Sequence, residues 1–169
     1  QVIHPWQNFN GITTEHYINY DYGNGTYWHG HEIVLPTEFL HGLYDGGLGA
    51  GLYDYWELMW NNPKAAGGFL WGFADEGVVR TDKNGMTDTN GSSAPDGILG
   101  PHHEKEGSFF AIKEIWSPVR FEDKEITPEF DGMLNLENRY LFSNTNSCSF
   151  TWKLARLPLP GKDPAGNQP

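Results

Sequence analysis

Short apolar runs and stretches of helical periodicity alternate along the first part of the chain. Residues 2–6 and 32–39 are apolar runs of the length of buried strands. Over residues 48–59 apolar side chains recur at helical spacing, up to an Asn-Asn-Pro sequence that ends the pattern. A third apolar run at 68–73 precedes an amphipathic pattern at 104–116. The order strand, strand, helix, strand, helix predicts a parallel α/β sheet or barrel.

The pattern changes after Pro118. Three segments then alternate apolar and polar side chains as half-buried strands do, at residues 119–124, 133–142 and 149–155. Asp131-Gly132 and Asn144-Thr145-Asn146 lie between these segments and fit hairpin turns. We therefore expect two domains, an α/β part over residues 1–118 and the start of a β-sandwich over residues 119–169.

The chain is acidic and rich in aromatic side chains. It has 169 residues with 22 Asp and Glu against 11 Lys and Arg, a formal net charge of -11. This charge disfavours nucleic acid or an anionic membrane surface as a partner. No apolar run approaches the roughly 20 residues of a membrane span, no signal peptide is visible, and the single Cys148 excludes an internal disulfide. The 7 Trp, 8 Tyr and 10 Phe suit either sugar binding or ordinary core packing.

Carboxylates stand at the ends of two predicted strands. Glu38 ends the second apolar run, and Asp75 and Glu76 follow the third. In α/β barrels the active site lies at the carboxyl ends of the strands, so each acid is a candidate nucleophile, general acid/base or metal ligand. The alternative is a solvated loop acid. The sequence His29-Gly30-His31-Glu32 fixes no third ligand by its spacing, and we expect a polar loop rim there and no metal site.

The residues around Glu38 resemble the nucleophile strand of microbial β-galactosidases of glycoside hydrolase family 2. That strand has Glu, an aromatic, a small or apolar residue, His and a Gly-containing turn, the order found in Glu38-Phe39-Leu40-His41-Gly42. Residues 55–56 look like part of the next helix of that family, and residues 67–75 look like its last barrel strand. Residues 96–99 resemble the exit from the barrel, and residues 140–142 resemble part of the following β-domain. The resemblance covers nearly the whole chain. It implies the C-terminal portion of a (β/α)8 TIM barrel followed by a partial immunoglobulin-like sandwich.

The resemblance also implies a role for individual residues. Glu38 is similar to the nucleophile of a retaining, double-displacement hydrolysis of terminal β-linked sugars. His41 resembles a sugar-contacting His, and Trp71 resembles an aromatic that lines the sugar subsite. Asp96 stands where such enzymes often have Asn near the sugar and an active-site cation. No obligatory cofactor is implied, and a divalent or monovalent cation stays open.

The match to two further catalytic features is incomplete. Trp6 or Gln7 corresponds in place to a Tyr that hydrogen-bonds the nucleophile in that family. The family's acid/base Glu lies on an earlier strand in an Asn-Glu pair, and no such pair follows a strand here. A retaining hydrolase needs two carboxyl groups about 5–5.5 Å apart. We therefore expect this chain to be a fragment, with the remainder of the enzyme supplying the upstream barrel strands and the acid/base Glu.

Three functional hypotheses of different class follow. The first is a β-galactosidase-like hydrolase acting on a carbohydrate substrate, with β-glucuronidase or algal galactan cleavage as related activities. The second is a non-catalytic carbohydrate-binding or accessory protein, and the third a structural β-domain with an appended α/β piece. The collinear resemblance disfavours the third. The sugar, the linkage, a homo-oligomeric state and a periplasmic, extracellular or cytoplasmic location in a bacterium stay open.

Overall fold

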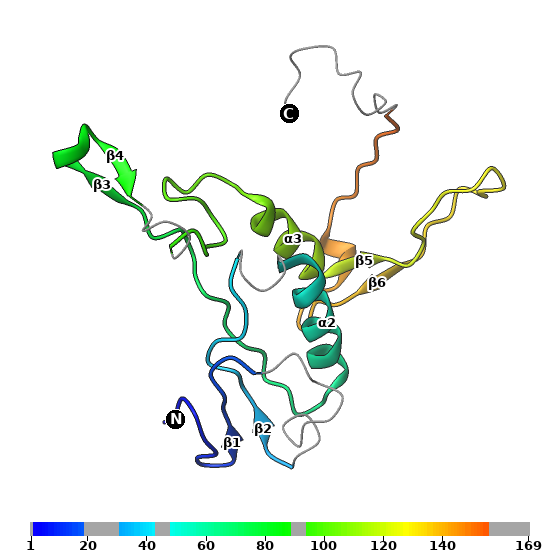
Figure 1. The fold of residues 1–169 in the computed structure, drawn as a ribbon. Coiled ribbons are helices and arrows are strands. Elements are labelled where there is room, and N and C mark those ends of the chain that lie inside the picture. Colours follow the sequence, from blue (N-terminus) through cyan, green and yellow to red (C-terminus); the bar gives the residue numbers. More distant parts are fainter. Residues whose placement is uncertain (1, 19–30, 43–47, 89–93, 156–169) are drawn as a thin grey trace. The chain divides into compact units, whose positions relative to one another are not determined.

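The computed structural model describes residues 2–18, 31–42, 48–88 and 94–155 (Figure 1). The chain is mixed α/β and divides into two compact units, Gln1–Ser117 and Pro118–Pro169. That these units are a barrel portion and a sandwich portion stays a prediction. No helix within the described ranges is long and apolar enough to cross a membrane.

Among the described residues of the first unit, every element except the two α-helices is short. Its helices are α2 (Leu48–Asn61), α3 (Gly107–Ile115) and the single-turn η1 (Thr81–Lys83). Its strands are β1 (Ile12–Thr13), β2 (Ile33–Val34), β3 (Val78–Arg80) and β4 (Met86–Asp88). The predicted helix over 48–59 is confirmed, because α2 covers that segment.

Parallel pairing joins the extended segments of the first unit. Strands β1 and β2 pair in parallel, and backbone hydrogen bonds continue this pairing as far as Thr37, whose N–H donates to the Glu15 carbonyl over 3.0 Å. The next segment along the chain pairs in the same sense: the Phe39 N–H donates to Phe69 over 3.1 Å, and Trp71 donates to Leu40 over 2.9 Å. The parallel relationship predicted between residues 32–39 and 68–73 is thus confirmed, although 68–73 contributes one isolated bridge, from Trp71 to His41, and not a continuous strand.

The first predicted strand, at residues 2–6, is wrong. These residues form no strand, and Trp6 is 65% exposed. Pro5 has no N–H to donate to a ladder. The chain instead enters the sheet at β1, after a tight turn at Asn10-Gly11 whose φ values of 54° and 76° are those of a type I′ hairpin turn. Phe9 and Ile12 exchange both backbone hydrogen bonds across this turn, at 2.9 and 3.1 Å.

The stretch from residue 76 to 106 contains elements that the pattern of apolar positions did not predict, and the helix predicted from residue 104 begins later. It contains the antiparallel hairpin β3–β4, and Asn84-Gly85 takes positive φ at its turn. Helix α3 begins at Gly107, three residues late. The Gly100 N–H donates to the Glu104 carbonyl over 2.9 Å, so residues 100–104 close a loop before the helix starts.

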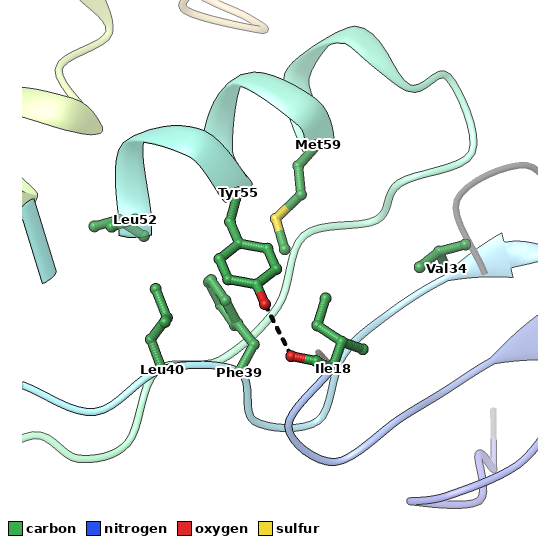
Figure 2. Packing of buried hydrophobic residues seen from close by; sticks show 7 residues of the cluster. All are labelled: Ile18, Val34, Phe39, Leu40, Leu52, Tyr55 and Met59. Carbon is green, nitrogen blue, oxygen red and sulfur yellow. Dashed lines mark hydrogen bonds between the residues drawn. The ribbon is translucent and has the colours of Figure 1, made fainter. Parts of the chain in front are cut away.

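One face of α2 covers the paired segments. Leu52, Tyr55 and Met59 point from α2 toward Phe39 and Leu40, and all five are buried (Figure 2). The Tyr55 ring meets the Phe39 ring edge-on at 5.5 Å. Its hydroxyl donates to the backbone carbonyl of Ile18 over 2.8 Å, so the one polar atom of the ring is satisfied inside the core. Helix α3 packs beside α2 through Ile112, Ile115 and Trp116.

In its described residues, 118–155, the second unit forms a small antiparallel hairpin with attached loops. Strands β5 (Val119–Phe121) and β6 (Leu136–Asn138) pair with Arg120 opposite Glu137, and the single turn η2 (Thr145–Ser147) follows. The predicted strands at 119–124 and 133–142 are therefore present in shortened form. The predicted strand at 149–155 is wrong, because those residues have no strand partner among the described residues. Trp152 is 88% exposed.

Candidate active site around Glu38

Two neighbouring parallel segments position Glu38. The Thr37 N–H donates to Glu15 over 3.0 Å, and the Tyr17 N–H donates to the Glu38 carbonyl over 2.7 Å. His16 and Glu38 form a parallel bridge between these bonds. The pairing therefore places His16 and Tyr17 beside Glu38 near the carboxyl ends of both segments.

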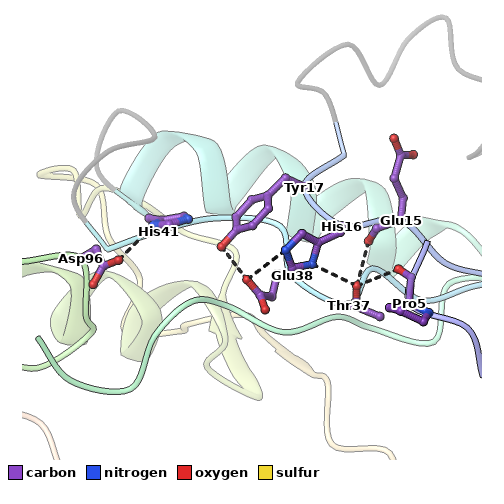
Figure 3. Close-up of polar contacts among 8 residues, drawn as sticks. All are labelled: Pro5, Glu15, His16, Tyr17, Thr37, Glu38, His41 and Asp96. Atoms are coloured by element: carbon purple, nitrogen blue, oxygen red, sulfur yellow. Dashed lines mark hydrogen bonds and ion pairs between the residues drawn. The ribbon is translucent and has the colours of Figure 1, made fainter. Parts of the chain in front are cut away.

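The Glu38 carboxylate receives two contacts on the same oxygen (Figure 3). The Tyr17 hydroxyl donates to Oε2 over 2.7 Å. The His16 Nε2 atom lies 3.6 Å from that Oε2. The side chain of Glu38 is 24% exposed, so it is neither a core residue nor a solvated loop acid. Both contacts therefore fall on Oε2 and neither involves Oε1.

A second polar pair lies on the next part of this surface. The His41 Nδ1 atom is 3.3 Å from Oδ2 of Asp96. Asp96 is 5% exposed, and its Oδ1 atom is buried without a hydrogen-bond partner in the described structure. The Tyr17 ring packs on the His41 ring with centroids 4.9 Å apart, so it joins the Glu38 contact to the His41–Asp96 pair.

Close backbone packing brings Asp96 to His41. The Gly42 N–H donates to the Asp96 carbonyl over 2.7 Å. A Cβ atom on Gly42 would overlap the backbone oxygen of Gly97, and a Cβ on Gly97 would overlap the backbone of Ala74. The buried hydroxyl of Ser108, in the first turn of α3, donates to the Gly42 carbonyl over 2.7 Å. Only glycine at both positions permits this approach.

The two tryptophans named from the sequence lie at different places. Trp71 forms a parallel bridge with His41 and is 40% exposed. Trp6 meets the His16 ring edge-on at 5.9 Å and makes no hydrogen bond to Glu38. The hydrogen bond that the resemblance assigned to Trp6 or Gln7 is made by Tyr17. The assignment to Trp6 or Gln7 followed from placing the first strand too early in the chain. Because the strand begins after Asn10-Gly11, Tyr17 follows β1 at the position where Glu38 follows β2, and the Tyr17 N–H donates to the Glu38 carbonyl.

The other candidate acids do not join Glu38. The Oδ1 atom of Asp75 accepts the Gly97 N–H over 2.8 Å, so this side chain fastens the loop that carries Asp96. Figure 3 shows the carboxyl group of Glu15 directed away from Glu38. Burial raises the pKa of Glu106, and the nearby charges of Asp75 and Glu104 raise it further. No cluster of three or more His, Cys, Asp or Glu that could hold a metal occurs in the described segments, and His29 lies outside them.

Similarity to known proteins adds to this geometry. No family model matches the chain. A β-galactosidase of Priestia megaterium is 25% identical over 133 residues, which is 72% of this chain and 12% of that protein. The β-galactosidase of Alteromonas mediterranea is 26% identical over 133 residues, which is 72% of this chain and 12% of that protein. The β-galactosidase of Pectobacterium atrosepticum is 22% identical over 135 residues, which is 73% of this chain and 12% of that protein. The chain is thus distantly similar to β-galactosidases and spans about 12% of the length of these relatives.

Proposed function

We propose that this chain supplies the nucleophile side of a retaining, β-galactosidase-like glycoside hydrolase of family 2, with Glu38 as the nucleophile. The observation that carries the proposal is the contact between Tyr17 and Oε2 of Glu38, at the end of a parallel pair and beside His41 and Asp96. The distant similarity to β-galactosidases supports it independently.

The proposed chemistry is a double displacement. Oε1 of Glu38 attacks the anomeric carbon of a terminal β-galactoside, and the bond to the aglycone oxygen breaks as that oxygen takes a proton from a second carboxylic acid. The product is a glycosyl ester in which Oε2 becomes the carbonyl oxygen, still within reach of the Tyr17 hydroxyl. Water, deprotonated by the second carboxylate, then attacks the same carbon and releases the sugar and the Glu38 carboxylate.

The second carboxylate belongs, in this proposal, to a larger enzyme context. Glu15 points away from Glu38, and Asp75 is bonded to Gly97. The remaining barrel strands would carry the acid/base Glu, and residues of the second unit would begin the following sandwich domain. The resemblance and the small share of each relative's length that the chain covers support this arrangement.

The residues beside the nucleophile would bind the sugar. His41 and Asp96 present polar atoms, and Trp71 offers a partly exposed ring next to His41. The unpartnered Oδ1 of Asp96 is a buried acceptor that a sugar hydroxyl or a cation would satisfy. A cation there would neutralise the carboxylate and orient sugar oxygens. Trp6, at the edge of His16, would line the entrance.

The test is made on the natural polypeptide that carries this sequence. Its reaction with a 2-deoxy-2-fluoro galactoside bearing a dinitrophenolate leaving group should place one sugar on the peptide that contains Glu38. The fluorine slows both steps, and the activated leaving group lets only the first proceed at a useful rate. Glu38→Gln should lose label and turnover by several orders of magnitude but retain sugar binding. Glu15→Gln is the matched control and should label normally. Label on another acid, or full activity of Glu38→Gln, would remove the proposal.

A further inference from the structure

We propose that His16 is a positioning residue for Glu38, an imidazolium that holds Oε2 and stabilises Glu38 when it departs as a carboxylate. This inference rests on the proposed role of Glu38 as the nucleophile. It concerns the second step of the reaction, in which the glycosyl ester is broken.

The Thr37 hydroxyl lies within hydrogen-bond distance of two backbone carbonyl oxygens. Its Oγ1 atom lies 3.1 Å from the carbonyl oxygen of Pro5 and 3.3 Å from that of Glu15. Carbonyl oxygens only accept hydrogen bonds, so the single hydroxyl proton is directed to one of them. Toward other neighbours Thr37 therefore offers a lone pair.

That lone pair faces His16. The His16 Nδ1 atom lies 3.5 Å from Oγ1 of Thr37, and Nε2, on the other side of the ring, lies 3.6 Å from Oε2 of Glu38 (Figure 3). Both ring nitrogens thus face acceptors. A neutral imidazole carries one N–H and one lone pair, so it would turn a lone pair toward either the hydroxyl oxygen or the carboxylate. The imidazolium instead directs an N–H toward each of them.

The ring of His16 is held in this orientation by its aromatic neighbours. The Trp6 ring meets it edge-on at 5.9 Å and an interplanar angle of 88°. The Tyr17 ring meets it at 4.7 Å and 81°. Its side chain is 33% exposed, and its Nε2 atom lies 3.6 Å from the carboxylate. The neighbouring carboxyl group of Glu15 points away from the ring (Figure 3).

A cation at this place acts differently on the two steps. During attack Glu38 loses its negative charge to the new ester bond, so the interaction with His16 weakens. During hydrolysis the same charge returns to Glu38, and the imidazolium stabilises it as it develops. The Tyr17 hydroxyl also donates to Oε2, but as a neutral donor it responds less to the change of charge on Glu38 than a cation does. Loss of His16 should therefore slow release of the sugar more than its attachment.

The experiment compares His16→Gln with His4→Gln in the natural polypeptide. His4 is the matched control because its ring also packs beside Trp6, with centroids 6.3 Å apart, but has no contact with Glu38 among the described residues. The rates of formation and of reactivation of the 2-fluorogalactosyl adduct are measured separately. In His16→Gln we expect reactivation to slow by about three- to fivefold, the effect of a partly screened ion pair. Formation should change by less than about twofold, and His4→Gln should match the parent in both.

The possible outcomes separate the role of His16 from the proposed role of Glu38. A normal rate of reactivation in His16→Gln, or an equal decrease in the rates of formation and reactivation, overturns the role of His16. If Glu38 of the parent is labelled in the same experiment, the proposed function still stands. No label on Glu38 in the parent overturns both. Independently of turnover, ¹⁵N NMR of the parent at neutral pH should show two protonated ring nitrogens for His16, and this signature should be lost in Glu38→Gln. A neutral His16 ring in the parent would also overturn the inference.

Discussion

Tyr17 binds Glu38 twice, once through the backbone and once through the side chain. Its N–H donates to the Glu38 carbonyl over 2.7 Å, and its hydroxyl donates to Oε2 of the carboxylate over 2.7 Å. The backbone bond fixes which residue of one segment lies beside the other, and the hydroxyl then fixes the carboxylate. A one-residue shift in the parallel pairing would break both hydrogen bonds, so the register of the sheet determines the geometry of the site.

The first prediction concerns the hydroxyl of Tyr17. Tyr17→Phe keeps the ring that packs on His41 and removes the donor to Glu38. A hydrogen bond to a charged group contributes about 1.5–3 kcal/mol, so we expect turnover by the natural polypeptide to fall by roughly ten- to a hundredfold, with little change in Tm. Tyr140→Phe, in the second unit and 41% exposed, is the control. Unchanged kcat in Tyr17→Phe would show that the contact has no part in the reaction.

The second prediction concerns the glycines that bring Asp96 to His41. Gly42→Ala places a Cβ atom on the backbone of Gly97, and backbone cannot move aside as a flexible side chain can. We expect a loss of more than about 2 kcal/mol in the free energy of unfolding, measured by urea denaturation. Gly107→Ala, at the start of α3 with open space around its Cβ position, should be neutral or slightly stabilising. Equal stability of the two variants would show that Asp96 approaches His41 by another route.

The sequence predicted those features that depend on side-chain periodicity. Helix α2 was predicted because Leu52, Tyr55 and Met59 recur on one face, and the structure buries that face. The parallel sense of the pairing was predicted because a helix connects the second and third apolar runs. The candidate residues His41 and Asp96, far apart in the sequence, came from the resemblance, and the structure places them in contact.

The features that were missed depend on turns and on tertiary partners. The strand at residues 2–6 was predicted from apolarity alone, whereas the Asn10-Gly11 turn decides where pairing begins. That turn was visible as an Asn-Gly dipeptide, and so was the turn of the β3–β4 hairpin at Asn84-Gly85. The contact of His16 with Glu38 has no signal in the sequence, because it arises only when two segments pair.

The third prediction concerns the core beneath α2. Leu52 is fully buried, so Leu52→Ala should lower the free energy of unfolding by about 2–5 kcal/mol through lost contacts and the cavity left behind. Tyr55→Phe leaves the buried carbonyl of Ile18 without its donor, and we expect a smaller loss of about 1–3 kcal/mol. Denaturant unfolding of both variants measures these values. Val79→Ala, at an exposed site on β3, should stay within about 0.5 kcal/mol of the parent. A Tyr55→Phe variant as stable as the parent would mean that Ile18 finds another donor.

The last prediction concerns the response of the β3–β4 hairpin to acid. Arg80 donates to both oxygens of Asp82, at 2.8 and 2.6 Å, and to Asp88 at 2.7 Å. The hydrogen bond from Arg80 lowers the pKa of Asp82, and the two carboxylates raise the pKa of Arg80. A carboxyl group whose pKa is lowered on folding stabilises the hairpin above its unfolded pKa, and this contribution disappears as the pH falls through the lower folded value. The raised pKa of Arg80 acts only at the alkaline extreme. We therefore expect constant hairpin structure at neutral pH and loosening in acid only.

Carboxyl ¹³C titration of Asp82 tests this expectation. Its midpoint should lie below that of an unperturbed Asp in the parent and should move up toward that value in Arg80→Gln. Lys83→Gln removes a neighbouring positive charge from η1 that makes no hydrogen bond to Asp82, so it should leave the midpoint nearly where it is. Because the pair is exposed, added salt should weaken the effect in the parent. If Arg80→Gln and Lys83→Gln shift the midpoint equally, the cause is the general positive field of the hairpin and not the hydrogen bonds of Arg80.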